Sequence, residues 1–377
     1  MNELIFNLKP GIESPSFIAT ADVHLGKRLY LMPELEEDMN TNFVNLAKMA
    51  IEYKVEYLVI AGDMFESNNY VKPHTIAFIT NTVEELKKHG IQTVGIAGDH
   101  DKPLKGEAWV HISQISPVTV EPCFAGIDYF DYSTVSVEEL VERLKEHTEP
   151  ENVLWLFLHC QFPQLFEKTD RKKMIDYNQL RLFDNFPNIQ GVIAGDLHFA
   201  PEIKAYGPGK EAYVGYPGSL GINDKSEFKH KKHVLYCDGK SLFQVPFPVL
   251  RTSLEIDFRG DLANNFDVEE TLKWAKDQTN KPLIYVYYDT DSEGQIHKIT
   301  PLYNCALVHR QQVPLGVKNL DDAQIITSRS ETSADEKINS ALAYYCKDDP
   351  ELFGLAAALI KNDTNEILTE FKDKFDL

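Results

Sequence analysis

The chain of 377 residues is poor in cysteine and has no long apolar run. Its five cysteines are scattered and form no Cys-x-x-Cys pair, which argues against a disulfide framework and a zinc ribbon. No segment approaches the roughly 18 apolar residues of a membrane-spanning helix. Residues 1–5 also lack the start of a secretion signal. We therefore expect no membrane association and a cytoplasmic protein, in a cell or in the host of a virus.

Positive charge is also scarce. The sequence has 38 lysines and arginines against 58 acidic residues, a net charge of -20. Proteins that bind nucleic acid usually contact its phosphates with clustered Lys and Arg, so a nucleic-acid partner would need bound metal ions to reverse the local sign. Two basic islands, 171–173 and 225–233, interrupt the acidic background. Most such islands are solvated loops, and substrate binding is the alternative.

Five short apolar runs each end on an acid or a histidine. Three of them contain the tetrapeptide Ile-Ala-Gly-Asp, and all five lie at 16–24, 57–63, 93–101, 154–159 and 191–198. Such runs predict buried strands, and groups just past strand ends meet at one edge of a sheet, where ligands bind in open α/β folds. A single Asp in this position is often only the N-cap of the next helix. Five together predict a metal site.

The donor types define the chemistry of this predicted site. Asp22 with His24 and Asp196 with His198 are i, i+2 pairs, which point to one face of an extended backbone. Carboxylates and imidazoles without thiolates suit Mn, Mg, Fe or Zn, and two ions need a bridging carboxylate, for which Asp63 is the candidate. Two ions hold a phosphoryl group and activate water, so we expect phosphoester hydrolysis.

Two further residues suit proton transfer in this reaction. His100 lies between two acids and is the candidate proton donor to the departing oxygen, and Asp101 is the candidate for orienting its ring.

The rest of the chain predicts alternating elements. Apolar spacing predicts helices at 34–53 and 73–88, and a second sheet follows residue 199. Residues 251–326 form a strand, helix, strand group that we interpret as a small accessory domain. Residues 327–377 contain two helices with apolar stripes, which either pack on this chain or dock on a partner helix.

The candidate ligands form five motifs along the chain: Asp22-x-His24, Gly62-Asp63, Gly98-Asp99-His100-Asp101, His159 and Gly195-Asp196-x-His198. The order of these motifs resembles that of the calcineurin-like metallophosphoesterase superfamily. The phrase Gly215-Tyr-Pro-Gly-Ser219 is similar to the SbcD-type nuclease subunit of DNA double-strand-break processing. The resemblance implies a four-layer αββα sandwich, of mixed α+β or α/β class, over residues 1–250, a DNA-engaging cap over 251–326, and C-terminal helices that hold an SbcC-like coiled-coil ATPase. It also implies duplex DNA ends or hairpins as substrate and a homodimer within a heterotetramer.

The same resemblance implies two groups of metal ligands. The first ion would bind Asp22, His24, Asp63 and His198, and the second Asp63, Asp99, His159 and Asp196. The family pattern has Asn where Asp99 stands and His where Asp196 stands, so both departures fall on the second ion. We expect a harder second site that prefers manganese, or magnesium, to zinc. The two replacements either retune or attenuate it.

Two other functions remain open. The core motifs fix phosphoester chemistry and leave the ester open, so a phosphatase or a small phosphodiesterase is one alternative. A catalytically attenuated scaffold is the other, because the altered second ion site and the acidic charge fit a degenerate site. Exonuclease and endonuclease activity are both compatible with the motifs.

Overall fold

A computed structural model describes residues 2–66, 71–101, 123–129, 131–146, 148–165, 170–259 and 266–313. The chain divides into two compact units. One comprises Met1–Ile256, Asp267–Val286 and His297–His309, and the other Asp257–Phe266, Tyr287–Ile296 and Arg310–Leu377. Within the described ranges, no helix is both long and apolar enough to cross a membrane.

The first unit contains a six-stranded mixed sheet. Its strands lie in the order β1 (Glu3–Asn7), β11 (Ser241–Phe247), β10 (Lys232–Cys237), β2 (Phe17–Thr20), β3 (Tyr57–Ala61) and β4 (Gln92–Ile96). Strands β2, β3 and β4 are parallel, and β10 joins β2 antiparallel. The three parallel strands are three of the predicted apolar runs, so their carboxyl ends lie at one edge, as expected.

A second sheet of five strands contains the other two runs, so the five runs end at the edges of two sheets and not of one. The expected second sheet after residue 199 is also wrong, because this sheet begins at Phe124 and the strands after residue 231 join the first sheet. Its order is β5 (Phe124–Gly126), β6 (Trp155–His159), β7 (Gly191–Gly195), β9 (Lys210–Gly215) and β8 (Glu202–Gly207). All pairs are parallel except the β8–β9 hairpin. Strands β6 and β7 are buried along their whole length, which explains why their sequences are continuous apolar runs rather than alternating ones.

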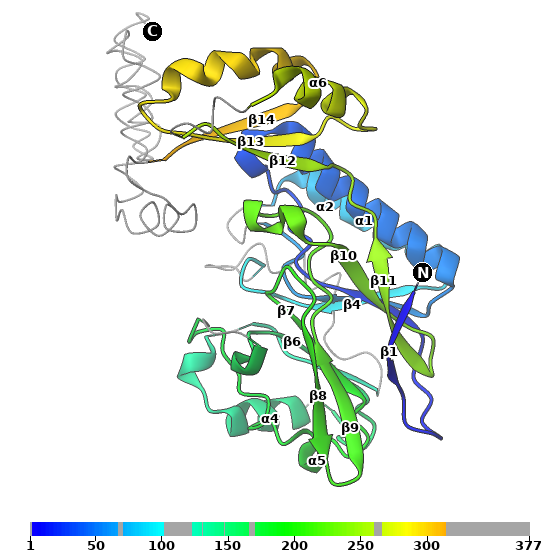
Figure 1. The fold of residues 1–377 in the computed structure, drawn as a ribbon. Helices are drawn as coiled ribbons and strands as arrows, with labels where there is room; N and C mark the ends of the chain where they lie inside the picture. Colours follow the sequence, from blue (N-terminus) through cyan, green and yellow to red (C-terminus); the bar gives the residue numbers. More distant parts are fainter. Residues whose placement is uncertain are drawn as a thin grey trace, which may run out of the picture. The chain divides into compact units, whose positions relative to one another are not determined.

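Helices cover the outer face of each sheet (Figure 1). On the six-stranded sheet, α1 (Pro33–Tyr53) and α2 (Pro73–Lys88) bury Phe43, Leu46 and Ile79 against strand residues. On the five-stranded sheet, α4 (Val137–Lys145) packs with the short α5 (Leu182–Asn185) in a second core. The predicted four-layer αββα sandwich is therefore confirmed.

The two sheets pack on each other through aromatic side chains. Phe17 of β2 makes edge-to-face contacts with Phe124, Trp155 and Phe157 of the other sheet, at centroid distances of 5.7, 5.1 and 6.4 Å. Edge-to-face pairs of this kind add to the stability gained from burial. The Phe17 ring is fully buried, so this contact fixes how the carboxyl ends of the two sheets approach one another.

The predicted strand, helix, strand group is also present. A three-stranded sheet has the order β12 (Ser253–Asp257), β13 (Leu283–Tyr288) and β14 (Leu307–Gln312). The connecting helix α6 (Val268–Lys276) begins after Asp267, whose carboxylate caps the backbone N–H groups of Glu269 and Glu270. The limits of the accessory domain stay a prediction, and the predicted helices of 327–377 lie outside the described residues.

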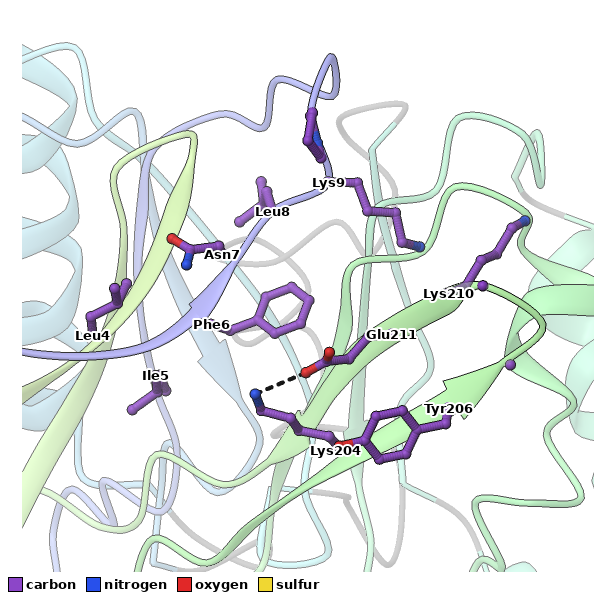
Figure 2. A pocket seen from close by; sticks show the side chains of 13 residues that line it. Leu4, Ile5, Phe6, Asn7, Leu8, Lys9, Lys204, Tyr206, Lys210 and Glu211 are labelled. Atoms are coloured by element: carbon purple, nitrogen blue, oxygen red, sulfur yellow. Dashed lines mark ion pairs between the residues drawn. The ribbon is translucent and has the colours of Figure 1, made fainter.

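A pocket of about 730 Å³ lies between β1 and the β8–β9 hairpin (Figure 2). Lys9 and Lys210 lie on its rim, and Lys204 forms an ion pair with Glu211 at 2.8 Å. None of the residues that line it is a predicted metal ligand. Catalytic chemistry therefore has to be sought at the strand ends.

We predict that Phe17→Ala lowers the free energy of unfolding by about 3–5 kcal/mol, because it opens a cavity between the sheets. Urea denaturation followed by circular dichroism measures this loss. The matched control is Tyr206→Ala, whose ring is 75% exposed and which should change stability by no more than about 0.5 kcal/mol. Equal effects of the two substitutions would contradict the role given to Phe17.

Candidate metal centre

The candidate ligands follow the carboxyl ends of five strands, and their backbone is unusual. Asp22, His24, Asp63 and Asp196 all have positive φ, of 52°, 50°, 53° and 91°. Residues with a side chain rarely adopt this conformation, and it concentrates at functional sites because it costs free energy. The surrounding hydrogen bonds hold it in place: the Asp22 N–H donates to the Gly62 carbonyl and the His24 N–H to the Asp63 carbonyl, at 3.1 and 3.0 Å.

Steric crowding explains why a glycine precedes each aspartate of the repeated Gly-Asp. A Cβ on Gly98 would lie 2.0 Å from Oδ1 of Asp63, and one on Gly195 would lie 2.0 Å from the Ala61 carbonyl oxygen. Neither position has room for a side chain. The repeated Gly-Asp of the sequence is therefore required by the close approach of neighbouring strand ends.

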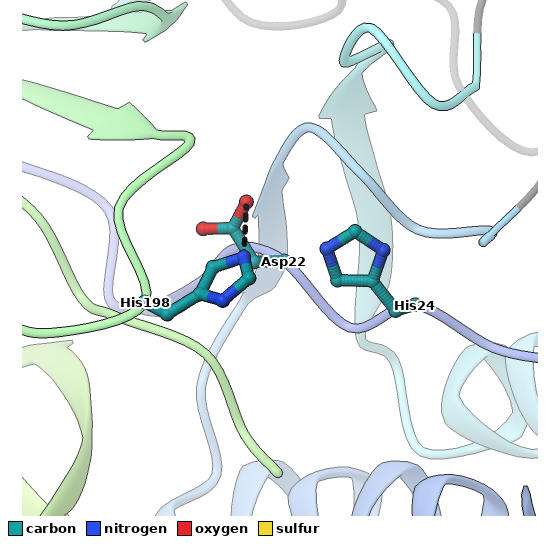
Figure 3. Close-up of side chains that lie close together, drawn as sticks. All are labelled: Asp22, His24 and His198. Atoms are coloured by element: carbon teal, nitrogen blue, oxygen red, sulfur yellow. Dashed lines mark ion pairs between the residues drawn. The ribbon is translucent and has the colours of Figure 1, made fainter. Parts of the chain in front are cut away.

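Asp22, His24 and His198 converge at the junction of the two sheets (Figure 3). Their ligand atoms lie within 4.8 Å of one another, and Nε2 of His198 is 4.0 Å from Oδ1 of Asp22. Burial raises the pKa of Asp22. Both ring nitrogens of His24 are buried without a hydrogen-bond partner among the described residues, and Nε2 lies 3.7 Å from Oδ2 of Asp63. An unpartnered buried nitrogen beside carboxylates fits a metal ion.

Each imidazole of the site has Nδ1 beside an oxygen of an outer residue, by an ion-pair contact for His24 and by a hydrogen bond for the other three, which leaves Nε2 for the centre. Such outer contacts orient the histidines of metal sites. The partners are Glu66 Oε2 for His24 at 2.9 Å, the Ala61 carbonyl for His159 at 3.0 Å, Glu227 Oε1 for His198 at 2.6 Å, and the Glu66 carbonyl for His100 at 2.9 Å.

Glu227 belongs to a buried polar cluster. It accepts from Ser219 Oγ at 2.7 Å and from the Asn223 N–H at 3.2 Å, and it forms an ion pair with Lys232. Burial alone would raise the pKa of Glu227, but His198 and Lys232 hold it at about 2. Part of the predicted basic island at 225–233 is thus a buried support for His198, because Glu227 and Lys232 are among its residues.

The remaining ligand candidates, Asp99, His159 and Asp196, also converge within 4.8 Å. Nε2 of His159 is 3.2 Å from Asp99 Oδ1 and 3.4 Å from Asp63 Oδ2. Here a lysine is present as well: Nζ of Lys173 is 2.9 Å from Asp99 and forms a still shorter ion pair with Asp196. Burial alone would lower the pKa of Lys173, but Asp196 and Asp99 outweigh it and raise that pKa, so the ammonium stays charged.

The loop after β4 places His100 at the site. The His100 N–H donates to Oδ1 of Asp63 at 3.0 Å, and its ring lies 4.9 Å from that of His24. Asp101 has a different position from the one expected. Its carboxylate accepts from the backbone N–H groups of Met64, Phe65 and Gly98 at 3.1, 2.8 and 3.0 Å.

Burial, followed by the charge of Asp63, raises the pKa of Asp101 to about 7. The contact that orients the His100 ring comes from the Glu66 carbonyl, so the expectation that Asp101 supplies it is corrected. Asp101 instead fixes the two loops to each other.

Sequence reasoning missed four residues of the centre. Glu66 follows Asp63 by three positions, and this proximity was its only signal. Glu227 and Lys173 lie in the two basic islands, where sequence alone did not separate buried charges from solvated ones. Gln161, which donates to Oδ2 of Asp196, follows His159 by two residues and has no motif of its own.

We predict that Gly98→Ala lowers the free energy of unfolding by about 1–3 kcal/mol, because the new methyl group overlaps Asp63. Chemical denaturation without added metal measures it. Gly294→Ala is the matched control, since a Cβ there meets nothing within 4 Å. If the two variants unfold at the same denaturant concentration, the steric argument is wrong.

The comparisons with known proteins agree with this geometry. Residues 15–200 match the family model of the calcineurin-like phosphoesterases. A DNA double-strand break repair protein Mre11 from Saccharolobus solfataricus is 35% identical over 94% of this chain and 97% of its own length. The Mre11 protein of Methanosarcina mazei is 26% identical over 59% of this chain, and the match spans only 36% of that protein.

Among solved structures, a dimetal phosphatase from Danio rerio is 12% identical, with a TM-score of 0.42 over 62% of this chain and 100% of its own. The near full-length similarity to the Saccharolobus protein is the informative match, because it includes the region after the phosphoesterase domain. The chain therefore belongs to the calcineurin-like phosphoesterases, in the family of the archaeal Mre11 proteins.

Proposed function

We propose that this chain is a metal-dependent DNA nuclease. The observation that carries the proposal is the convergence of His24, His198, Asp22 and Asp63 at the ends of strands from both sheets, with a buried and unpartnered Nε2 on His24. The names of the Mre11 relatives support DNA breaks as the substrate. Hydrolysis of a phosphodiester is the reaction that this set of donors suits.

The residues that would hold a divalent ion are Asp22, His24, Asp63 and His198. When bound, such an ion supplies a Lewis acid that lowers the pKa of a water molecule and stabilises charge on phosphoryl oxygens. Carboxylates and imidazoles without thiolates suit manganese, magnesium, iron or zinc, and we propose manganese, with magnesium next. A second divalent ion does not fit the other expected group of ligands, because the Lys173 ammonium already lies against Asp99 and Asp196. That group consists of Asp63, Asp99, His159 and Asp196.

His100 is the proposed proton donor. The Glu66 carbonyl can only accept, so the hydrogen bond at 2.9 Å places a proton on Nδ1 of His100. The protonated ring then has a second proton on Nε2 for the oxygen that leaves the phosphorus. The backbone contact of His100 to Asp63 keeps this ring beside the ligand set.

The proposed assembly follows the family. We propose duplex DNA ends or hairpins as substrate, residues 251–326 as the DNA-engaging part, and 327–377 as the segment that binds an SbcC-like ATPase, within a complex that contains two copies of this chain. Cleavage is proposed at a phosphodiester of the DNA backbone, whether from an end or internally.

We predict that the purified chain hydrolyses linear duplex DNA with manganese and that His100→Ala lowers the rate by about 10²–10⁴-fold, the usual contribution of a general acid. Gel assays with and without an SbcC-like ATPase measure this rate. His89→Ala, a change at an exposed histidine, is the control and should be neutral.

Two outcomes of the same assay favour the alternatives. Cleavage of a small chromogenic diester but of no DNA, with or without the ATPase, would support another phosphoesterase. No hydrolysis of any ester with manganese, magnesium or zinc would support the attenuated scaffold.

We also predict that Glu227→Gln raises the dissociation constant for manganese by about 10–100-fold, because Gln removes the charge that orients His198. Isothermal titration calorimetry gives the constant. Glu211→Gln, which alters only an ion pair on the β8–β9 hairpin, should leave it unchanged. Unaltered affinity in the Glu227 variant would remove His198 from the ligand set.

A further inference from the structure

Lys173 is placed at the metal centre by its backbone. Its carbonyl accepts from the Gln161 N–H at 2.7 Å, and the Ile175 N–H donates to the Gln161 carbonyl at 3.0 Å. Gln161 and Met174 form a parallel bridge there. Because Gln161 follows the end of β6 by two residues, the turn that carries Lys173 is tied to the strand that presents His159.

The side chain of Lys173 connects two carboxylates from different sheets. Its ammonium lies 2.9 Å from each oxygen of Asp99, after β4, and forms a shorter ion pair with Oδ1 of Asp196, after β7. The side chains of Lys173 and Asp99 are 20% and 24% exposed, and that of Asp196 only 5%. The contact is therefore a partly buried ion pair, whose most buried member is Asp196.

The other contacts of these carboxylates leave little room for a metal ion. Oδ2 of Asp196 accepts from Gln161 Nε2, and Oδ1 of Asp99 also faces Nε2 of His159 at 3.2 Å. All four oxygens of the two aspartates thus have a partner. In the neighbouring group, Asp22 and Asp63 accept the backbone N–H groups of Asp196 and His100, but Nε2 of His24 has no hydrogen-bond partner among the described residues.

We propose that the Lys173 ammonium stands in for a second divalent cation, so that this centre takes one ion, held by Asp22, His24, Asp63 and His198. This inference rests on the proposed function in one respect, that the first group binds a metal. The ammonium provides one positive charge and N–H donors at the position that faces Asp99, His159 and Asp196. A divalent ion there would meet electrostatic repulsion from Lys173 and would have to break both of its ion pairs.

The assignment also defines what this half of the centre does. A lysine ammonium is a point charge that donates hydrogen bonds to phosphoryl oxygens and does not activate water. We therefore place the activation of water at the first group alone, while Lys173 neutralises charge on Asp99 and Asp196 in the other half.

Metal stoichiometry tests the proposal. The apo chain is titrated with manganese by calorimetry, and the bound ions are examined by electron paramagnetic resonance, which distinguishes an isolated ion from a spin-coupled pair. The wild-type chain should bind one isolated ion. Lys173→Met removes the charge and keeps an unbranched side chain that is one atom shorter, and this variant should bind a second ion that couples to the first. Lys173→Arg, which keeps the charge, should still bind one.

Lys172→Met is the matched control, because it makes the same change at an exposed lysine of the same turn. It should behave as the wild type. Two coupled ions in the wild-type chain would overturn the proposal without any need for a folded variant. One ion in both the wild type and folded Lys173→Met would overturn it too, since Lys173 would then not be what excludes the second ion. These results are independent of DNA hydrolysis, whose failure would count against the proposed nuclease and not against the stoichiometry.

Discussion

The arrangement of the centre depends on one contact, which the buried carboxylate of Asp22 makes between the two sheets. Asp22 follows β2 of the six-stranded sheet, and its carboxylate accepts the backbone N–H of Asp196, after β7 of the five-stranded sheet, at 3.1 and 3.2 Å. A charged group without water is costly unless it is hydrogen-bonded, so this carboxylate holds the strand ends of the two sheets together. Gly195 makes the approach sterically feasible, and the Phe17 aromatic cluster supports it from within the sandwich.

The sequence predicted correctly that the candidate ligands lie at the ends of strands. The five apolar runs became β2, β3, β4, β6 and β7. All except β4 are buried along their whole length, and continuous apolar sequence is what strands buried on both faces require. Prediction from the sequence failed where a side chain reaches the centre from elsewhere in the chain. Lys173 lies on a turn and Glu227 on a short 3-10 helix (Lys225–Lys229), and no local pattern encodes the tertiary position of either. Asp101 faces backbone N–H groups rather than the ring of its neighbour.

Lys173 gives one explanation for both departures from the family pattern, Asp99 in place of Asn and Asp196 in place of His. Neutral Asn and His side chains would give an ammonium no charged partner, whereas Asp99 and Asp196 form ion pairs with it. The repeated Ile-Ala-Gly-Asp and the basic island at 171–173 are then two parts of one feature.

Metal binding and folding stability are coupled in such a centre. Four of its residues have positive φ, and Asp22 and Asp63 are buried close together, so the ligand-free site holds backbone strain and repulsion between carboxylates. The outer contacts from Glu66, Glu227 and Ala61 orient the imidazoles of His24, His198 and His159. An ion that binds only the folded chain stabilises it by mass action. The Lys173 half needs no such ion, because its compensating charge is part of the polypeptide, and this makes the two halves of the centre unequal in their dependence on metal.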